Sequence, residues 1–396
     1  MKKLIGLALA VLVASVAAGT ASAGPKVAAA SGISCSGTIK IAIVTPLTGG
    51  AGFLGTEQLS WAKYAVATLA KPMGLKIQLL LGDTPVEQGP AIAQTLAQKY
   101  VADSKVVGVI GPATSGGAVA STQTYNQAGI AQVDQSATST TLTKHDSSQK
   151  PPYTGTPSFF RVIPGDYVQG PTDAHYMIDK LKVKNVAIVD FQEPYSVGLA
   201  NAAQAVLKKA GVTVTRLSAP NTTTDYSAYV TKVPSNADVV FFPTQKPGDA
   251  QTFAQQLIEQ GKKAKVFGSD GSNDSTQFKV PGSYVSNFAP DITGIPADKA
   301  IIAGWKKANP GTAVGSFGPP AYGATQVLLT AIKKACVADH GVIKAKRDVL
   351  RQVKKVRIAN WILGGSFRFS TKSNDPLNAK FYIFQIQSNG SYKLVG

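Results

Sequence analysis

The sequence contains few of the residues on which enzymes and metal proteins depend: three histidines and two cysteines among 396 residues. The histidines, His145, His175 and His340, stand far apart, and none has a cysteine or carboxylate at the spacing of metal ligands. The glycine-rich fingerprints of nucleotide-binding loops and the nucleophile elbow of hydrolases are also missing. The sequence therefore offers no candidate catalytic base or nucleophile, and we expect a protein that is not an enzyme and uses no cofactor or metal.

Acidic residues are also scarce: 22 Asp and Glu stand against 40 Lys and Arg, which gives a formal net charge of +18. Such a charge could attract nucleic acid or an anionic surface. The lysines are scattered in pairs such as Lys208-Lys209 and Lys333-Lys334, near the ends of expected helices, where they oppose the helix dipole. No basic stripe interleaved with aromatic residues is present. We expect no nucleic-acid partner, and attraction to an anionic cell envelope stays open.

Long apolar runs are confined to the N-terminus. Met1-Lys2-Lys3 precedes an uncharged apolar stretch at 4–19, and Ala21-Ser22-Ala23 follows with the small-x-small pattern of a cleavage site. This order predicts a cleaved signal peptide over 1–23 and a flexible lead over 24–37; a retained anchor helix is the alternative. No later stretch approaches the ~20 apolar residues of a membrane span. We therefore expect a soluble periplasmic or extracellular protein.

The two cysteines, Cys35 and Cys336, lie before the first expected strand and near the end of a late helix. In an exported chain, such a pair favours a disulfide, with two free thiols as the alternative. Lipidation of Cys35 is disfavoured, because Gly32-Ile33-Ser34 is a poor lipid-attachment motif. We expect the bridge to tie the amino terminus to a segment late in the chain.

Short β-branched runs alternate with amphipathic helical patterns along most of the sequence. A first block extends from the strand expected at 39–44 to that at 130–133, and a second from 159–163 to 266–268. A loop rich in Ser, Thr and Pro at 138–157 separates them. Alternation of this kind indicates βαβ units with parallel sheets. The fold class that we expect is α/β, with two doubly wound lobes.

The remainder of the chain returns to helices and closes with two strands, at 380–386 and 391–395. The helices are expected at 297–309, 321–335 and 343–356. They are too poor in strands to form a third lobe, so we expect them to cover the first sheet. This predicts a first lobe of residues 38–163 and 290–369 and a second of 164–289 and 370–396. Ligands of such sheets bind beyond the carboxyl ends of the strands, so a cleft between the lobes, closing about the crossings, is the expected site.

Polar residues follow the expected strands of the first lobe. The segment 111–117 (GPATSGG) follows a strand and opens a helix, so its backbone N–H groups and hydroxyls suit an anion such as a carboxylate. Ordinary capping by Thr114 or Ser115 is the alternative. The segment 135–138 (QSAT) follows the next strand and offers hydroxyls and carbonyls to the same crevice.

Two polar side chains take comparable places in the second lobe. Asp270 follows a strand end, where its carboxylate could neutralise a ligand ammonium, although another helix cap is the alternative. Tyr195 lies beyond the strand that ends at Asp190, where an aromatic ring can cover a ligand.

The ordered set of motifs is similar to that of one known family. The segments 39–49 (IKIAIVTPLTG), 109–115 (VIGPATS) and 321–324 (AYGA) resemble the substrate-binding proteins of branched-chain amino acid ABC transporters, over nearly all the mature chain. The resemblance implies the type I periplasmic binding fold and a monomeric receptor. Such a receptor closes on an amino acid or a related solute and delivers it to the membrane subunits of an ABC permease.

The resemblance also implies a role for individual residues. Ser115 matches the serine that binds the ligand carboxylate, and Ser136 a position that lends its backbone carbonyl to the ammonium. Thr138 matches the threonine that contacts both ligand ends. Tyr195 matches an aromatic residue of the cleft wall, and Asp270 an acidic residue that faces the ammonium, with a shorter reach than the family's glutamate.

Two positions depart from the pattern of leucine binders. Leu54 and Gln245 stand where those proteins carry tyrosine, and both positions shape the side-chain pocket of the family. The anchor for an α-amino acid is retained, whereas the side-chain preference is open. Relatives also take amides, urea and aromatic acids, so the alternative function is a sensory receptor for an amide or aromatic-acid solute that uses the same cleft.

Overall fold

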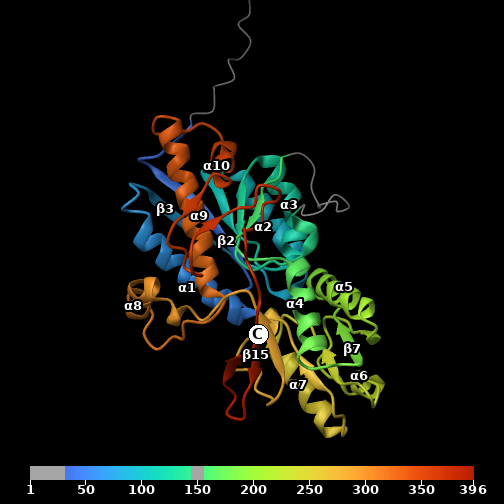
Figure 1. The fold of residues 1–396 in the computed structure, drawn as a ribbon. Coiled ribbons are helices and arrows are strands. Elements are labelled where there is room, and N and C mark those ends of the chain that lie inside the picture. The colour runs from blue at the N-terminus through green and yellow to red at the C-terminus, as the bar shows by residue number, and fades with distance from the viewer. Residues whose placement is uncertain (1–31, 144–155) are drawn as a thin grey trace, which may run out of the picture. The chain divides into compact units, whose positions relative to one another are not determined.

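The computed structural model describes residues 32–143 and 156–396, so the predicted signal peptide and most of the loop expected at 138–157 lie outside the described residues. Within the described ranges, the strands form two main sheets and two short pairs. Figure 1 shows the helices that flank the two sheets. No helix in these ranges has the length and apolar character that a membrane span requires.

The first sheet has five strands in the order β3-β2-β4-β5-β6, and all its neighbours are parallel. They are β2 (Thr38–Thr45), β3 (Lys76–Asp83), β4 (Val106–Ile110), β5 (Ala131–Asp134) and β6 (Phe159–Arg161). The helices that follow the first strands are α1 (Gly52–Leu69), α2 (Ala91–Ala102) and α3 (Ser115–Ala128). The central strands β4 and β5 are buried along their whole length, as expected for parallel strands with both faces covered.

The sequence predicted that the three late helices cover this first sheet, and two of them do. The three helices are α8 (Lys299–Ala308), α9 (Gly318–Ala338) and α10 (Lys346–Val353). Helices α9 and α10 pack against β4 and β5, and α8 stacks Trp305 on Trp61 of α1 with ring centroids 4.6 Å apart. The helix predicted at 343–356 begins later than expected, because Ile343 belongs to a short strand, β12 (Val342–Ile343).

The second sheet has seven strands in the order β16-β15-β11-β10-β9-β7-β8. They are β7 (Asn185–Asp190), β8 (Thr213–Ser218), β9 (Val239–Phe241), β10 (Lys265–Phe267), β11 (Tyr284–Asn287), β15 (Tyr382–Ile386) and β16 (Tyr392–Leu394). Its helices are α4 (Asp166–Asp179), α5 (Pro194–Lys209), α6 (Ser227–Lys232) and α7 (Pro247–Glu259). Strands β15 and β16 are antiparallel to their neighbours at one edge, and the other pairs are parallel.

The described chain passes between the two sheets three times (Figure 1). We name residues 162–165 the first crossing, residues 288–291 the second crossing, and residues 369–381 the third crossing, which follows β14 (Phe367–Arg368). β14 pairs with β13 (Arg357–Ile358) in a small separate hairpin. Hinges lie in the segments that connect two lobes, so these three crossings are the candidate hinge.

A disulfide joins Cys35 to Cys336 of α9, with a Cα–Cα distance of 5.9 Å, so the prediction of a disulfide is confirmed. Next to it, β1 (Ile33–Ser34) pairs antiparallel with β12. The flexible lead predicted at 24–37 is therefore wrong at its C-terminal end, because strand pairing and the disulfide hold residues 33–35; residues 24–31 lie outside the described part of the chain. The bridge spans 301 residues, and closing so long a loop restricts the unfolded chain strongly.

Candidate ligand-binding site

The first half of the site lies at the carboxyl ends of β4 and β5. Thr114 is the N-cap of α3, and its Oγ1 accepts a hydrogen bond from the backbone N–H of Gly117 at 3.3 Å. Ordinary helix capping, the alternative role considered for this segment, is therefore confirmed for Thr114. Ser115 has a different role, because its Oγ accepts from the backbone N–H of Ser139 at 3.0 Å. This contact uses an oxygen lone pair, so the Ser115 hydroxyl can still donate its proton to a carboxylate at the helix N-terminus.

The side chain of Ser136 is held by the protein itself. Its Oγ donates to the carbonyl of Ala113 at 2.7 Å and accepts from Gln58 Nε2 at 2.9 Å. Gln58 is fully buried, and its Oε1 accepts from Thr45 Oγ1 at 2.6 Å. The hydroxyl of Ser136 is thus committed to the fold, which is compatible with the role expected for its backbone carbonyl. Sequence reasoning missed Gln58. Its place next to Leu59, on the apolar stripe of the expected helix, was a signal that its side chain is buried.

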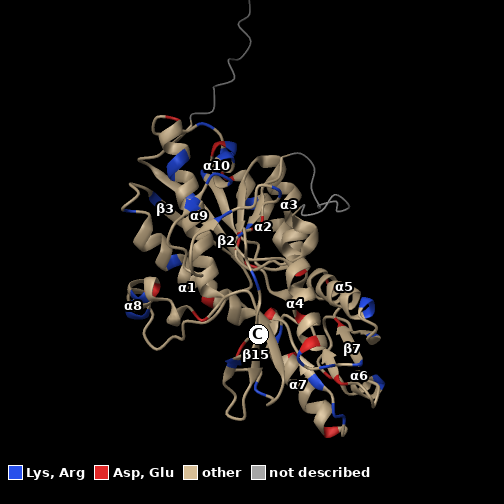
Figure 2. Cartoon of the chain, in the orientation of Figure 1, with Lys and Arg blue, Asp and Glu red and all other residues tan. Residues whose placement is uncertain are grey.

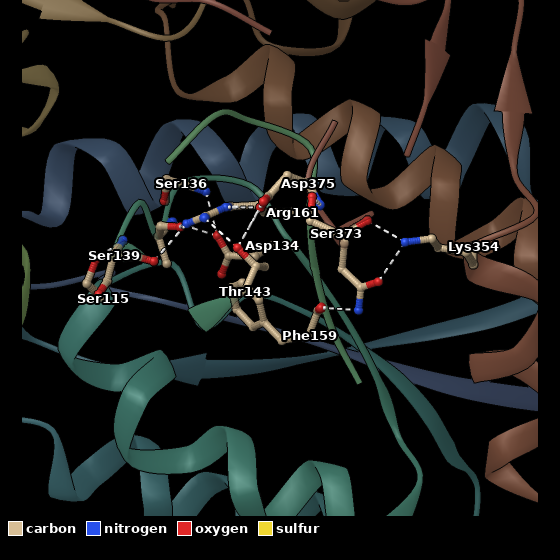
Figure 3. Close-up of polar contacts among 12 residues, drawn as sticks. Ser115, Asp134, Ser136, Ser139, Thr143, Phe159, Arg161, Lys354, Ser373 and Asp375 are labelled. Atoms are coloured by element: carbon tan, nitrogen blue, oxygen red, sulfur yellow. Dashed lines mark hydrogen bonds and ion pairs between the residues drawn. The ribbon is translucent and has the colours of Figure 1, made fainter. Parts of the chain in front are cut away.

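A buried arginine fixes the loop that carries Ser136 and Thr138 (Figure 3). Arg161 Nη1 donates to the carbonyls of Ala137 at 3.2 Å and Ser139 at 3.0 Å. Its Nε donates to Asp375 Oδ1 of the third crossing at 2.7 Å, and neither side chain has appreciable exposure. Burial alone would raise the pKa of Asp375, but the guanidinium beside it brings that pKa below its ordinary value. The pair is therefore ionised, and it links the loop to the third crossing.

The third crossing is anchored to β6 and to the end of α10 by one more residue, Asn374. Its backbone carbonyl accepts from the N–H of Arg161 at 3.2 Å, and its Nδ2 donates to the carbonyl of Phe159 at 2.9 Å. Lys354 Nζ donates to Asn374 Oδ1 at 3.0 Å and to the carbonyl of Ser373 (Figure 3). The loop of the first half-site and the third crossing therefore form one hydrogen-bonded unit.

The second half of the site gathers around Asp270, which follows β10. The Tyr195 hydroxyl donates to Asp270 Oδ1 at 2.7 Å and accepts from the backbone N–H of Gly271 at 3.1 Å. Gln169 Nε2 donates to the same carboxylate oxygen, also at 2.7 Å. All three side chains are buried. The structure thus brings Tyr195 and Asp270 into direct contact.

Two further carboxylates, on the buried face of α4, accompany Asp270. Asp166 and Asp173 are both fully buried, and Ser286 Oγ donates to Asp173 at 3.1 Å. Burial raises the pKa of Asp270 to about 6 and that of Asp166 to about 7, and it raises the pKa of Asp173 well above its ordinary value. Within the described residues, Asp173 Oδ1 and Gln169 Oε1 accept no hydrogen bond. An environment of buried acceptors without donors suits a cationic ligand group.

The two halves meet at Thr138 and Asp166. The backbone N–H of Asp166 donates to the carbonyl of Thr138 at 2.8 Å, and the Thr138 hydroxyl beside the Asp166 carboxylate offsets part of its raised pKa. Asp166 in turn lies close enough to Asp270 for their like charges to interact. Thr138 of the first half and Asp270 of the second are therefore linked through Asp166.

The two positions expected to shape the side-chain pocket have different surroundings. Gln245 is half-buried and lines a cavity of about 70 Å³ together with Gly116 of the first lobe and Pro194 of the second. Leu54 is 3% exposed and packs in the apolar core of the first lobe. A pocket role for either residue stays a prediction.

Sequence reasoning missed the polar residues of α4, and it placed the start of this helix at Gln169, whereas the helix begins at Asp166. Asp166, Gln169 and Asp173 stand at spacings of three and four residues, which places them on one face of a helix. Ala174 and Met177 are buried on the same helix. Polar side chains at helical spacing beside a buried apolar set were the signal that could have identified them.

A family model described as periplasmic binding protein matches residues 38–391. The chain belongs to the periplasmic binding protein family. The Leu/Ile/Val-binding protein BraC3 of Rhizobium johnstonii is 30% identical over 330 residues, which cover 81% of this chain and 85% of that relative. The resemblance inferred from the sequence motifs is thereby confirmed.

Two solved structures show the same fold. The leucine-binding protein LivK of Thermotoga maritima MSB8 has a TM-score of 0.79 and 21% identity, covering 90% of this chain and 98% of its own. The substrate-binding protein LivJ of a branched-chain amino acid transporter from Streptococcus pneumoniae, solved with isoleucine, has a TM-score of 0.76 and 23% identity, covering 91% and 99%. The predicted two-lobed α/β fold of the type I periplasmic binding proteins is confirmed.

Proposed function

We propose that the protein is the solute receptor of an ABC importer and binds an amino acid between its two lobes. The first lobe comprises residues 38–163 and 290–369, and the second comprises residues 164–289 and 370–396. The observation that carries the proposal is the convergence of a half-site of hydroxyls at a helix N-terminus with a half-site of buried carboxylates. An α-amino acid carries a carboxylate that suits the first half-site and an ammonium that suits the second.

The ligand carboxylate lies toward Ser115, where the helix dipole and a free hydroxyl proton favour a negative charge. The ligand ammonium lies toward Asp270, with the carbonyl of Ser136 and the hydroxyl of Thr138 between the two ends. An ammonium beside Asp270 would lower the raised pKa of that carboxylate and keep it ionised at neutral pH. Tyr195 forms part of the wall and holds Asp270 in place.

The side chain of the ligand is aliphatic or of similar size. The named relatives support this class, since they are called Leu/Ile/Val-binding, leucine-binding and branched-chain amino acid transporter proteins. The half-buried Gln245 at the rim of the site leaves room for a preference that differs from theirs.

The receptor works outside the cytoplasm as a monomer, after removal of residues 1–23, and hands its solute to the membrane subunits of a permease without chemical change. The basic and apolar pattern of the first residues supports export. The family model supports transport rather than catalysis.

The test is thermal unfolding of the protein against a panel of amino acids, amides and aromatic acids, after unfolding and refolding have removed any carried-over ligand. A ligand at about 100 times its dissociation constant stabilises the folded state by about 2.7 kcal/mol, which gives a clear rise of the melting temperature. We expect the rise with aliphatic amino acids. A rise with amides or acids alone, and with no amino acid, would contradict the proposal.

A further inference from the structure

A second and larger hollow lies where the three crossings run beside one another. It is a groove of about 750 Å³. Pro164 of the first crossing, Pro290 of the second crossing and residues 376–380 of the third crossing all line it. Among the described residues that line it, none lines the cavity that contains Gln245. The groove is therefore distinct from the proposed amino-acid site, and it is built from the segments that connect the lobes.

One wall of the groove is aromatic. Trp361 and Phe367 stack with their ring centroids 4.3 Å apart, and both are almost fully buried, so their positions are fixed by packing. Tyr382 of β15 also lines the groove. The partly exposed Tyr382 ring offers a surface on which a planar apolar group can stack, and the nearly buried Trp361–Phe367 pair gives the groove a rigid apolar edge.

The charges of the groove are all of one sign. Arg368 and Lys380 are its charged lining residues, and no Asp or Glu is among the described residues that line it. Both cations are exposed. The guanidinium of Arg368 makes no ion pair or hydrogen bond with any described residue, and Lys380 Nζ lies over the Tyr382 ring, 4.9 Å from its centroid. Two cations without a carboxylate partner, placed beside an aromatic wall, match a ligand that is negatively charged and flat.

We propose that this groove binds a small organic anion with a planar apolar body, of the aryl carboxylate class, and that its occupancy favours closure of the cleft. A ligand seated there contacts all three crossings, whose relative positions must change when the lobes move. It binds best to the arrangement of the crossings described here, in which the residues around Thr138 and Asp270 are buried. A ligand with unequal affinity for two arrangements shifts the population toward the one that it prefers. The binding site stands on its own geometry, whereas the coupling rests on the proposed function.

The first arm of the test uses 2-naphthoate as the probe and isothermal titration calorimetry on the full chain. Arg368→Gln should weaken naphthoate binding by roughly tenfold, because a charge-assisted contact is lost. Lys372→Gln is the matched control: it removes one exposed positive charge from the third crossing outside the groove and should leave the affinity unchanged. Absence of naphthoate binding, or equal loss in both variants, would overturn the site.

The second arm measures leucine affinity with and without saturating naphthoate. We expect naphthoate to tighten leucine binding roughly fivefold in the unmodified protein and, at the same naphthoate concentration, to have a smaller effect in Arg368→Gln. An unchanged leucine affinity in the presence of bound naphthoate would overturn the coupling.

Asp270→Asn separates the two sites. Naphthoate binding that persists in this variant supports the groove, whereas its loss would mean that the probe sits in the amino-acid site, which overturns the proposal. Failure of leucine to bind, with naphthoate binding still dependent on Arg368, would contradict the proposed function and leave the groove in place.

Discussion

The two halves of the candidate site lie at equivalent strand ends but handle charge in opposite ways. In the first half, Arg161 has its partner in Asp375, and the buried Asp134 accepts hydrogen bonds from the backbone N–H groups of Ser136 and Ala137. In the second half, Asp166, Asp173 and Asp270 are buried close together, and no described cation pairs with any of them. The charged groups of the first half are therefore bonded within the protein, whereas the second half gains from a cation. This difference gives a zwitterion one preferred orientation.

The largest expected effect comes from breaking the internal pair of the first half. Asp375→Ala leaves the Arg161 guanidinium buried without its counter-charge, so the free energy of unfolding should fall by about 3–5 kcal/mol. Chemical denaturation measures this change. Asp179→Ala removes the carboxylate of an exposed pair with His175 and should cost less than about 0.5 kcal/mol. Equal losses in the two variants would mean that the Arg161–Asp375 pair does not stabilise the fold.

Removing a charge from the second half should have the opposite effect on stability. Asp270→Asn keeps an acceptor for Tyr195 and Gln169 but removes the charge that faces the ammonium, so amino-acid affinity should fall by about 100-fold. The unliganded variant should melt at the same or a higher temperature, because repulsion with Asp166 and Asp173 is relieved. Calorimetric titration and thermal unfolding measure the two quantities. Unchanged affinity would refute the role of Asp270.

Acid should act on the second half in the same way as this substitution. With a pKa of about 6, Asp270 is mostly protonated at pH 5, so amino-acid affinity should fall about tenfold between pH 7.5 and pH 5. The pKa values of Asp166 and Glu193 are also raised, to about 7. Groups whose pKa is raised on folding stabilise the folded state when protonated, and this contribution is lost as the pH rises through 6 to 7.

The unliganded protein should therefore gain stability from these carboxylates as the pH falls from 8 to 5, while ligand binding weakens. Melting temperatures and titrations across this range measure both trends. Affinity that stays constant down to pH 5 in the unmodified protein would show that no carboxylate with a raised pKa meets the ligand.

The smallest expected effect belongs to a single neutral contact of the first half. Ser115→Ala should weaken amino-acid binding about fivefold, since one hydroxyl contact to the ligand carboxylate is lost. Thr114→Ala is its neighbour and control: it removes the cap of α3 and should lower stability by about 1 kcal/mol with little change in affinity. A reversal of these two outcomes would assign the binding role to Thr114.

The local sequence pattern was sufficient to predict the two α/β lobes and to identify the polar residues that follow the strands. Strands of β-branched residues alternate with helices, and polar residues such as Ser115 and Asp270 stand directly after strands, where parallel sheets bind ligands. The buried ion pair behind the first half-site could not be predicted, because it depends on long-range pairing. Arg161 and Asp375 are 214 residues apart, and no periodicity relates them. The polar face of α4 was missed although Gln169 and Asp173 stand at helical spacing inside the helix that the sequence predicted.

The central claim is that the two halves recognise opposite ends of one zwitterion. The most direct measurement is a calorimetric comparison of L-leucine with 4-methylpentanoate, which lacks the ammonium, and 3-methylbutylamine, which lacks the carboxylate. We predict that leucine binds and that each truncated analogue binds at least about 100-fold more weakly, because one half-site is left without its partner. Binding of either analogue with the affinity of leucine would contradict the account.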